Sequence, residues 1–207
     1  MPHPRPDLTT HARDIAPLLL GAVLTSQVDG DRVELRITEV EAYGGVGEDP
    51  GSHAFRRKTP RNATMFGPPG CAYVYFTYGM HWCLNLVTGR EGAAGAVLIR
   101  AGAIIDGIGT ARERRPSART DRDLARGPAR LTAALGVSGK HDGLSLLSPE
   151  SPLRLILADQ PPSHVSIGPR TGVGGAGALT PWRFFLPDEP TVSPYRRAAP
   201  KRAAHVR

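Results

Sequence analysis

The sequence predicts a single α+β domain built around a curved, largely antiparallel sheet with flanking helices. The 207 residues and the hydrophobic content of 40% suit one domain with its own core. Short alternating or β-branched runs recur along the chain, and two of them lie close enough to form a hairpin. No linker divides the chain and no segment repeats at a fixed period, so we expect one continuous domain.

The strands are expected where β-branched and aromatic residues lie between turn residues. Residues 33–41 alternate and are rich in β-branched side chains. Residues 72–77 and 82–87 flank Tyr78-Gly79-Met80, which predicts a hairpin with its tip at those three residues. Further strands are predicted at residues 96–101, 153–158 and 182–186.

Two helices are expected, together with two segments of less regular structure. Residues 7–20 read as a short helix, and residues 128–135 as a helix with proline in its first turn and Gly136 just past its end. Residues 44–69 are rich in glycine, proline and charge and are mostly loop. Residues 106–126 are either an exposed helix or a mobile basic loop, with arginines at 112, 114, 115, 119, 122 and 126.

The two ends of the chain differ in composition from the rest. Proline and charge dominate residues 1–8, which predicts a disordered N-terminus. Residues 191–207 carry Arg196, Arg197, Lys201 and Arg202 with little apolar content, which predicts a basic tail. The tail either touches nucleic acid nonspecifically or is solvated without a role. The folded domain is therefore expected to span residues 9–190.

Charge and cysteine content narrow the possible partners. The formal net charge is +7 and the sequence pI is about 10.0, which favours a polyanionic partner, although solubility alone could account for it. The two cysteines, Cys71 and Cys83, have no zinc-ligand spacing, so we expect no metal and a reduced, cytoplasmic setting. The apolar run near residues 15–24 is too short to span a bilayer, and we expect neither a signal peptide nor a membrane segment.

Several enzyme classes lack their signatures in this sequence. There is no phosphate-binding G-x-x-x-x-G-K-[ST] loop and no G-x-S-x-G nucleophile elbow. The glycines at residues 172–175 do not follow a strand of a βαβ unit, so they are a weak dinucleotide signal. No zinc-deaminase H-x-E with P-C-x-x-C is present.

Aromatic and charged residues gather in one short part of the chain. Four of the five tyrosines lie between Tyr43 and Tyr78, together with Glu41, His53 and a run of basic residues. Aromatic faces next to cations and a carboxylate suit a site that stacks a flat base beside a polyanion. Glu39, Glu41 and Tyr43 would share one face of their strand, where a carboxylate could act as a general base; the other reading is a surface glutamate.

Other residues in this part of the chain allow two readings. Tyr73 and Tyr75 share a strand face and form either a stacking platform or core packing. Tyr78, at the predicted hairpin tip, could wedge into a base stack or fold back onto its own domain. His53, Asn85 and Arg100 could line a site or serve only local structure.

The order of motifs resembles the alkyladenine (3-methyladenine) DNA glycosylase family over roughly residues 12–190. The matching motifs are E-V-E-A-Y from Glu39, T-P-R-N from Thr59, M-F-G-P-P-G from Met65, Y-V-Y-F-T-Y-G-M-H-W-C-L-N from Tyr73, V-L-I-R-A from Val97, D-R-D-L-A-R-G-P-A-R-L from Asp121, P-R-T-G-V-G from Pro169 and P-W-R-F-F from Pro181. The family fold implied is also similar to the formyltransferase C-terminal domain. One departure is His81 after Met80, where relatives often have another aromatic residue.

The resemblance implies a role for each residue that matches a family motif. Glu41 matches the general base that activates water, and Arg100 and the Val173 carbonyl match groups that hold that water. The base pocket would consist of Tyr43, His53, Tyr75 and Asn85, with Asn85 disfavouring guanine. Tyr78 matches the intercalating residue. We expect backbone contacts from the exposed cations Arg56, Arg57 and Arg61.

The implied enzyme is a monofunctional glycosylase that starts base excision repair. Its partner would be double-stranded DNA carrying alkylated purines or deaminated ones such as hypoxanthine. No lysine lies at a matched catalytic position, so no lyase step is expected, and the family implies no cofactor. We expect a monomer in the cytoplasm, associated with the nucleoid.

Two alternatives stay open from the sequence. The first is a catalytically inactive nucleic-acid-binding domain of the same fold, which the retention of Glu41 and Arg100 disfavours. The second is a domain like the formyltransferase C-terminal domain, which would have no reason to keep Glu41, Tyr75 and Arg100 together.

Overall fold

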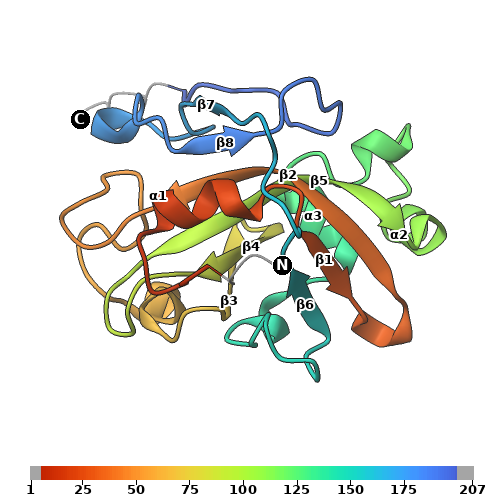
Figure 1. Ribbon diagram of the computed structural model, residues 1–207, viewed down its shortest axis with the longest axis horizontal. Coiled ribbons are helices and arrows are strands. Elements are labelled where there is room, and N and C mark those ends of the chain that lie inside the picture. Colours follow the sequence, from red (N-terminus) through yellow and green to blue (C-terminus); the bar gives the residue numbers. More distant parts are fainter. Residues whose placement is uncertain (1–5, 200–207) are drawn as a thin grey trace, which may run out of the picture.

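A long antiparallel pair of strands, β2 and β5, runs through the centre of the protein (Figure 1). The computed structural model describes residues 6–199. Within them eight strands form one sheet: β1 (Val23–Ser26), β2 (Val33–Tyr43), β3 (Ala72–Thr77), β4 (His81–Val87), β5 (Ala96–Asp106), β6 (Leu153–Ile156), β7 (Ser166–Gly168) and β8 (Arg183–Phe185).

The sheet is built outward from β2. The main path is β3-β4-β5-β2-β1-β6, and every pair in it is antiparallel. The first half of β2 pairs with β1, whereas Glu39–Glu41 pair with β8, which also pairs with β7. The second half of β2 therefore has a strand on both edges, and both edges reach the site described below.

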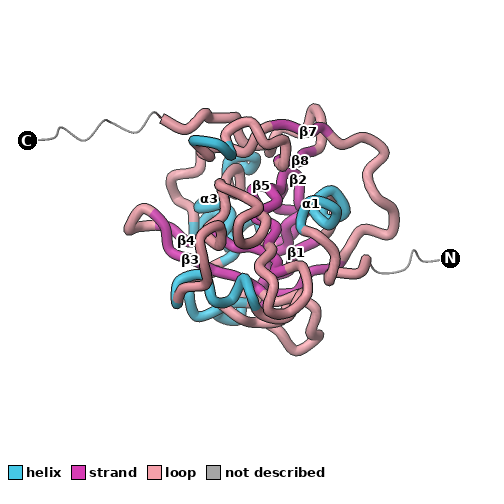
Figure 2. The backbone as a smooth tube through the Cα atoms, turned by 90° about the vertical axis from the view of Figure 1, so that its left-hand side faces the viewer, coloured by secondary structure: helices cyan, strands magenta, loops and turns pink. Residues whose placement is uncertain are grey.

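Helices cover both faces of the central strands. Short helix α1 (Ala12–Ile15) continues into a 3-10 turn at Ala16–Leu19, and it lies on the opposite side of the sheet from α3 (Pro128–Leu135) (Figure 2). Helix α2 (Ile108–Arg114) follows β5 directly. Helix α3 ends as the sequence predicts, because Gly136 adopts the left-handed conformation at φ +70° that closes a helix. A core of aliphatic side chains joins these layers.

The pairing of β2 with β5 is irregular between Glu34 and Leu35 and again around Glu39, and the second irregularity lies beside the pocket. Ile37 pairs with Gly102 and Val40 with Ile99, but Glu39 pairs with Ala101, which leaves Thr38 and Arg100 without direct partners. An irregularity of this kind reverses which side of a strand faces the core. The apolar series in β2 accordingly changes from Val33, Leu35 and Ile37 to Val40 and Ala42, all of which are fully buried in the core.

The predicted α+β class with an antiparallel sheet is confirmed, and so is the hairpin. The bounds of other predicted elements are corrected. Strand β5 continues five residues beyond the predicted end, to Asp106. The predicted helix over 7–20 is confined to residues 12–19. The basic segment 106–126 is not a single element, because α2 ends at Arg114 and only a short 3-10 turn follows at Asp121–Asp123.

The two predicted ends of the domain also contact its folded part. Leu8 packs against the core, and its carbonyl accepts a hydrogen bond from Gly89. Thr191 and Ser193, placed in the basic tail, are buried against the sheet. Lys201 and Arg202 lie outside the described residues. None of the helices within residues 6–199 has the length and apolar character needed to cross a membrane.

Gly102 should be the most sensitive glycine of the central pair. A Cβ there would lie 2.4 Å from Leu35 Cδ2 and 2.6 Å from the Arg36 carbonyl oxygen. We expect Gly102→Ala to lower the free energy of unfolding by about 1–3 kcal/mol, because the crowded pair must move apart. Chemical denaturation at neutral pH measures the change.

Gly109→Ala in α2 is the matched control, since no atom lies within 4 Å of a Cβ at that position. Its stability should equal or slightly exceed that of the wild type, because alanine favours helix. Equal stability for the two variants would contradict the crowding at Gly102.

Candidate active site

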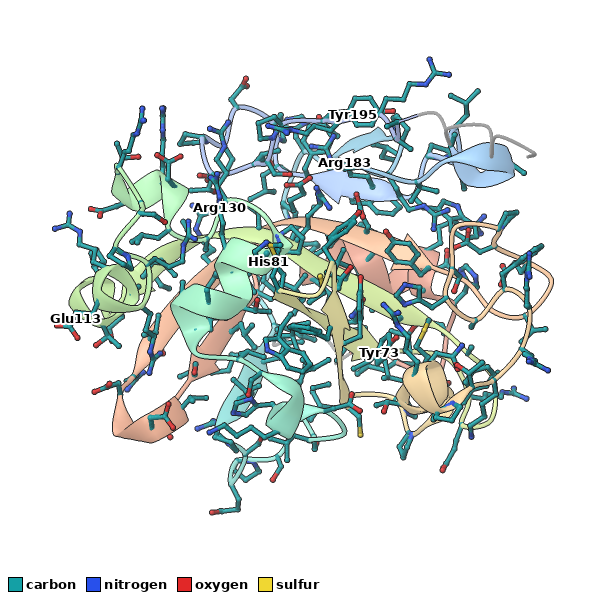
Figure 3. All side chains as sticks on the ribbon, turned by 180° about the vertical axis from the view of Figure 1, so that it is seen from behind. Tyr73, His81, Glu113, Arg130, Arg183 and Tyr195 are labelled. Atoms are coloured by element: carbon teal, nitrogen blue, oxygen red, sulfur yellow. The ribbon has the colours of Figure 1, made fainter. Side chains whose placement is uncertain are left out.

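A pocket of about 390 Å³ opens beside the irregular part of the β2–β5 pair. Its walls come from the β3–β4 hairpin, from β5, from the loop at Pro50 to His53, from residues 171–174 and from the first residues of α3. In Figure 3, Tyr73 lies on the hairpin side of the central strands and Arg183 on the β8 side. The lining includes seven predicted site residues: Tyr43, His53, Tyr75, Tyr78, Asn85, Arg100 and Val173.

Strand register explains why residues far apart in the sequence meet here. Glu41 pairs with Leu98, Leu98 pairs with Asn85, and Asn85 pairs with Tyr73. Directly paired residues point to the same face of a sheet, so this row runs across four strands beneath the pocket. The row joins the general-base candidate on β2 to the hairpin.

Glu41 has no exposed surface, and it does not itself line the pocket. Its Oε2 accepts a hydrogen bond from the Tyr43 hydroxyl at 2.8 Å, and its Oε1 accepts one from the Thr171 backbone N–H at 2.7 Å. Arg100 Nε lies 3.6 Å from Oε1. Three groups therefore fix the carboxylate, and each of them also lines the pocket.

Arg100 is held between two buried glutamates because it occupies the irregularity of β5. Its Nε lies 3.0 Å from Oε1 of Glu39 and donates to the Ser193 hydroxyl at 3.1 Å. Burial opposes the charge of Arg100, but the carboxylates of Glu41 and Glu39 outweigh it and raise the pKa of Arg100 above its ordinary value. The guanidinium therefore stays a cation beside Glu41.

Glu39 was not assigned a role from the sequence, yet it orients Arg100. It is fully buried, and it accepts hydrogen bonds from Arg183 Nε at 2.6 Å and from the Ser193 backbone N–H at 2.7 Å. The available signal was two glutamates on one strand face, since two buried carboxylates require cationic partners. The chain positions of those partners could not be read from the sequence.

Aromatic rings form the side walls of the pocket. The His53 ring meets the Tyr75 ring edge-on at 4.6 Å, and the Tyr73 and Tyr75 rings are 5.3 Å apart. Burial raises the pKa of Tyr43, Tyr73 and Tyr75, so all three hydroxyls stay protonated. Desolvation of the ring, followed by the charge of Arg61, lowers the pKa of His53, which keeps its imidazole neutral near pH 7.

Asn85 both lines the pocket and supports local structure, the two roles that the sequence left open. Its side-chain amide donates to the Tyr73 carbonyl at 2.9 Å, and the residue also lines the pocket. Because this hydrogen bond anchors the side chain to the neighbouring strand, the amide has a fixed position in the pocket wall. Cys83, on the same strand, lines the pocket as well, and burial raises the pKa of its thiol.

Tyr78 lies at the tip of the hairpin beside the mouth of the pocket. It adopts a left-handed backbone conformation at φ +52°, and 85% of its surface is exposed. Met80 on the same tip is 68% exposed. A large ring held on a turn with nothing around it is available to a partner rather than to the core.

The basic side chains predicted to contact a backbone lie outside the pocket. Arg56 and Arg57 are exposed on the segment before the 3-10 helix Pro60–Phe66, and Arg61 is exposed within that helix. Arg61 donates to the Phe76 carbonyl at 3.0 Å, which ties this segment to the hairpin. None of the three arginines lines the pocket, so they belong to the protein surface outside it.

Comparison with known proteins identifies the chain. The family profile described as methylpurine-DNA glycosylase matches residues 7–190. The chain belongs to this family.

Relatives of similar length agree with the family assignment, and each is provisionally named a 3-methyladenine DNA glycosylase. A protein of Streptomyces avermitilis is 56% identical over 91% of this chain and 89% of its own. A protein of Leifsonia xyli is 54% identical over 89% of this chain and 88% of its own. One of Burkholderia lata is 47% identical over 92% and 90%. Membership makes the protein a DNA glycosylase, an enzyme of DNA repair.

A buried ion pair that sequence reasoning missed supports the pocket of this methylpurine-DNA glycosylase. Arg170 is fully buried and makes a bidentate pair with Asp49, with 2.7 Å between Nη2 and Oδ1. It also donates to the Ala42 carbonyl and lies over the Tyr43 ring at 4.6 Å. At Gly51 a Cβ would lie 2.6 Å from Arg170 Nη2, so glycine is required there. The pair joins the segment after β2 to the segment that supplies Thr171.

No group of three or more histidine, cysteine, aspartate or glutamate side chains within residues 6–199 is arranged to hold a metal ion. Both carboxylate oxygens of Glu41 accept hydrogen bonds from within the protein.

The Asp49–Arg170 pair should dominate the acid sensitivity of the folded glycosylase. Burial opposes ionisation of Asp49, but the hydrogen bonds and charge of Arg170 outweigh it and lower the pKa of Asp49. Asp49→Asn leaves a buried cation without its partner, so we expect it to cost about 3–5 kcal/mol of unfolding free energy at pH 7. Urea denaturation measures the loss.

The sign of the pH dependence follows from the lowered pKa. The contribution of Asp49 is complete above its unfolded pKa of about 3.9 and is lost as pH falls through the folded pKa. The stability gap between wild type and Asp49→Asn should therefore narrow below about pH 4. Asp121→Asn, which breaks the exposed pair with Arg112, is the control and should change stability by less than about 1 kcal/mol. A stability difference between the wild type and Asp49→Asn that stays constant down to pH 3 would argue against a lowered pKa for Asp49.

Proposed function

We propose that this enzyme is a monofunctional glycosylase that flips alkylated purines out of duplex DNA and hydrolyses the N-glycosidic bond with a water activated by Glu41. The observation that carries the proposal is the fixed position of Glu41. Its carboxylate is fully buried behind the pocket wall, where the Tyr43 hydroxyl, the Thr171 N–H and Arg100 hold it. All three of these residues line the pocket. We propose that this oriented carboxylate accepts a proton from water once the flipped nucleotide has entered the pocket.

The proposed reaction is a displacement at the anomeric carbon of the flipped nucleotide. Glu41 accepts a proton as the water oxygen bonds to that carbon, and the electrons of the C–N bond pass to the leaving base. Arg100 and the Val173 backbone carbonyl, both at the pocket, hold the water. A base methylated at a ring nitrogen carries a positive charge, so it leaves as a neutral molecule and requires little acid catalysis. Neither Lys58 nor Lys140 lines the pocket, in keeping with a mechanism without a Schiff base.

The pocket walls suit a flat cationic base. Tyr43 and Tyr75 offer ring faces that attract a cation, which contributes about 0.5–2 kcal/mol per contact. His53 has a lowered pKa and so adds no positive charge that would repel such a base. Deaminated bases such as hypoxanthine are neutral, and we propose that they are slower substrates because this attraction is absent.

Asn85 is proposed to exclude normal guanine. Its amide is anchored to the Tyr73 carbonyl, so it cannot turn away from a bulky neighbour without losing a buried hydrogen bond. The exocyclic amino group of guanine would meet this fixed side chain.

Duplex binding is assigned to the surroundings of the pocket. Arg56, Arg57 and Arg61 are exposed cations that would meet backbone phosphates, and Tyr78 would fill the gap left by the flipped base. We propose that a monomer suffices, because one chain supplies the pocket, the wedge and the cations. The site of action would be chromosomal DNA in the cytoplasm.

Glu41→Gln should remove excision while leaving duplex binding intact. The amide has nearly the same shape but cannot accept a proton from water, so single-turnover base release should fall by a factor of about 100 to 10,000. Release of 3-methyladenine from methylated duplex DNA measures it. Glu34→Gln on the same strand, outside the pocket, should behave as the wild type.

Excision by Glu41→Gln at the rate of the wild type would refute the role of the carboxylate. Absence of base release by the wild type on methylated and hypoxanthine-containing duplexes would favour the inactive nucleic-acid-binding domain instead.

Tyr78→Ala should weaken lesion-specific binding and excision more than binding of undamaged duplex. Filling the gap in the stack offsets an unstacking cost of a few kcal/mol, whereas phosphate contacts dominate nonspecific binding. A fluorescent base analogue opposite the lesion would report flipping directly. Folding should be unchanged, because Tyr78 is 85% exposed.

Leu179→Ala is the control, since Leu179 is 81% exposed but does not line the pocket. If Tyr78→Ala flips and excises as well as Leu179→Ala, another residue is the wedge.

A further inference from the structure

A second hollow, of about 380 Å³, lies in the basic segment after α2 and has no part in the proposed chemistry. Arg112, Arg115, Arg119 and Asp121 are among the residues that line it. Residues 108–130 contain seven arginines against Glu113, Asp121 and Asp123, so 7 − 3 gives a net charge of +4. Such an excess of positive charge on one short segment favours an anionic partner.

Three of the seven arginines have internal partners. Arg112 is bidentate to Asp121 at 2.8 and 3.0 Å, which neutralises the one carboxylate that lines the hollow. Arg114 donates to the Val28 carbonyl and Arg126 to the Val192 carbonyl. The contacts of Arg114 and Arg126 attach the segment to the rest of the domain.

Arg115 differs from these three arginines because its buried Nε–H group has no hydrogen-bond partner among residues 6–199. Burial, followed by the charge of Arg130, lowers the pKa of Arg115, although Asp123 acts in the opposite sense. Arginine stays protonated in proteins, so Arg115 is a partly buried cation whose Nε–H has no acceptor among the described residues. Arg119 and Arg130, both exposed, make no hydrogen bond or ion pair within the described part of the chain.

Helix α3 lies between the hollow and the active-site pocket: Arg130 on this helix does not line the hollow, but its charge acts on Arg115. Pro128 and Ala129, the first residues of α3, line the pocket, and Arg130 follows them directly. Thr132 on the same helix donates to the Trp82 carbonyl at 2.9 Å, which attaches α3 to the hairpin strand that begins at His81. Figure 3 shows Arg130 at one end of α3 and His81 beside that helix.

We propose that the hollow around Arg115, with Arg119 and Arg130, binds a backbone phosphate of the same duplex at a fixed distance from the flipped nucleotide. The proposal rests on the proposed function for its choice of duplex DNA. A guanidinium with a free buried N–H is suited to a phosphate oxygen, since a charge-assisted hydrogen bond would satisfy the N–H and neutralise the cluster. The site would set the register of the protein along the DNA, because phosphate contacts position rather than specify.

The test is binding to undamaged duplex, so that it does not depend on base release. Arg115→Gln should lower affinity about tenfold and reduce the slope of log affinity against log salt by about 0.9, the value for one phosphate. Arg122→Gln is the matched control, because it removes one exposed arginine of the same segment that does not line the hollow. It should retain the slope of the wild type.

A scan with single methylphosphonate linkages locates the phosphate. One neutral linkage should weaken the wild type and Arg122→Gln, but should have no additional effect on Arg115→Gln. If every neutral linkage weakens Arg115→Gln as much as the wild type, the proposal is wrong. Should Arg115→Gln fail to fold, as a thermal melt would show, Arg130→Gln replaces it with the same expected loss of slope, since Arg130 is exposed.

The two proposals fail separately. Base release by the wild type with an unchanged salt slope in Arg115→Gln and Arg130→Gln would overturn the phosphate site alone. Absence of base release with a reduced slope would overturn the glycosylase mechanism and keep the anion site.

Discussion

The architecture depends on the burial of two carboxylates, Glu39 and Glu41, two residues apart on one strand. An ion taken out of water is costly unless charge and hydrogen bonds replace its hydration. Arg100 lies within reach of both, and Arg183 completes the shell of Glu39. The irregular pairing of β2 with β5 is what leaves Arg100 without a direct strand partner at this level. Without that irregularity the two negative charges would lack their shared cation.

A second buried ion pair, between Asp49 and Arg170, lies outside the sheet and also balances one buried charge with another. Asp49 and Arg170 join two loops that would otherwise be independent, and the Arg170 guanidinium also supports the ring of Tyr43. The loop held in this way supplies Thr171, whose N–H binds Glu41. The Arg100–Glu39 and Asp49–Arg170 ion pairs therefore hold the structure on both sides of Glu41. The hydrogen bonds that Glu41 itself accepts orient its carboxylate.

The sequence predicts local features well and long-range partners poorly. The strands 33–41 and 72–77, the hairpin tip and the glycine that closes α3 follow from patterns within a few residues. The family motifs also indicate the residues that meet at the pocket. In contrast, Asp49 and Arg170 are 121 positions apart, and no periodicity relates them. The extra length of β5 and the burial of Ser193 likewise depend on contacts with β2 that propensity does not encode.

The hydrogen bond from Ser193 to Glu39 joins residues that are 154 positions apart. During translation, both carboxylates therefore leave the ribosome long before Arg183 and Ser193 are synthesised. A nascent chain has the whole β3–β4 hairpin and most of its sheet, but its central charges are not yet balanced. The groups that complete the shell of Glu39 are therefore synthesised after every residue that lines the pocket.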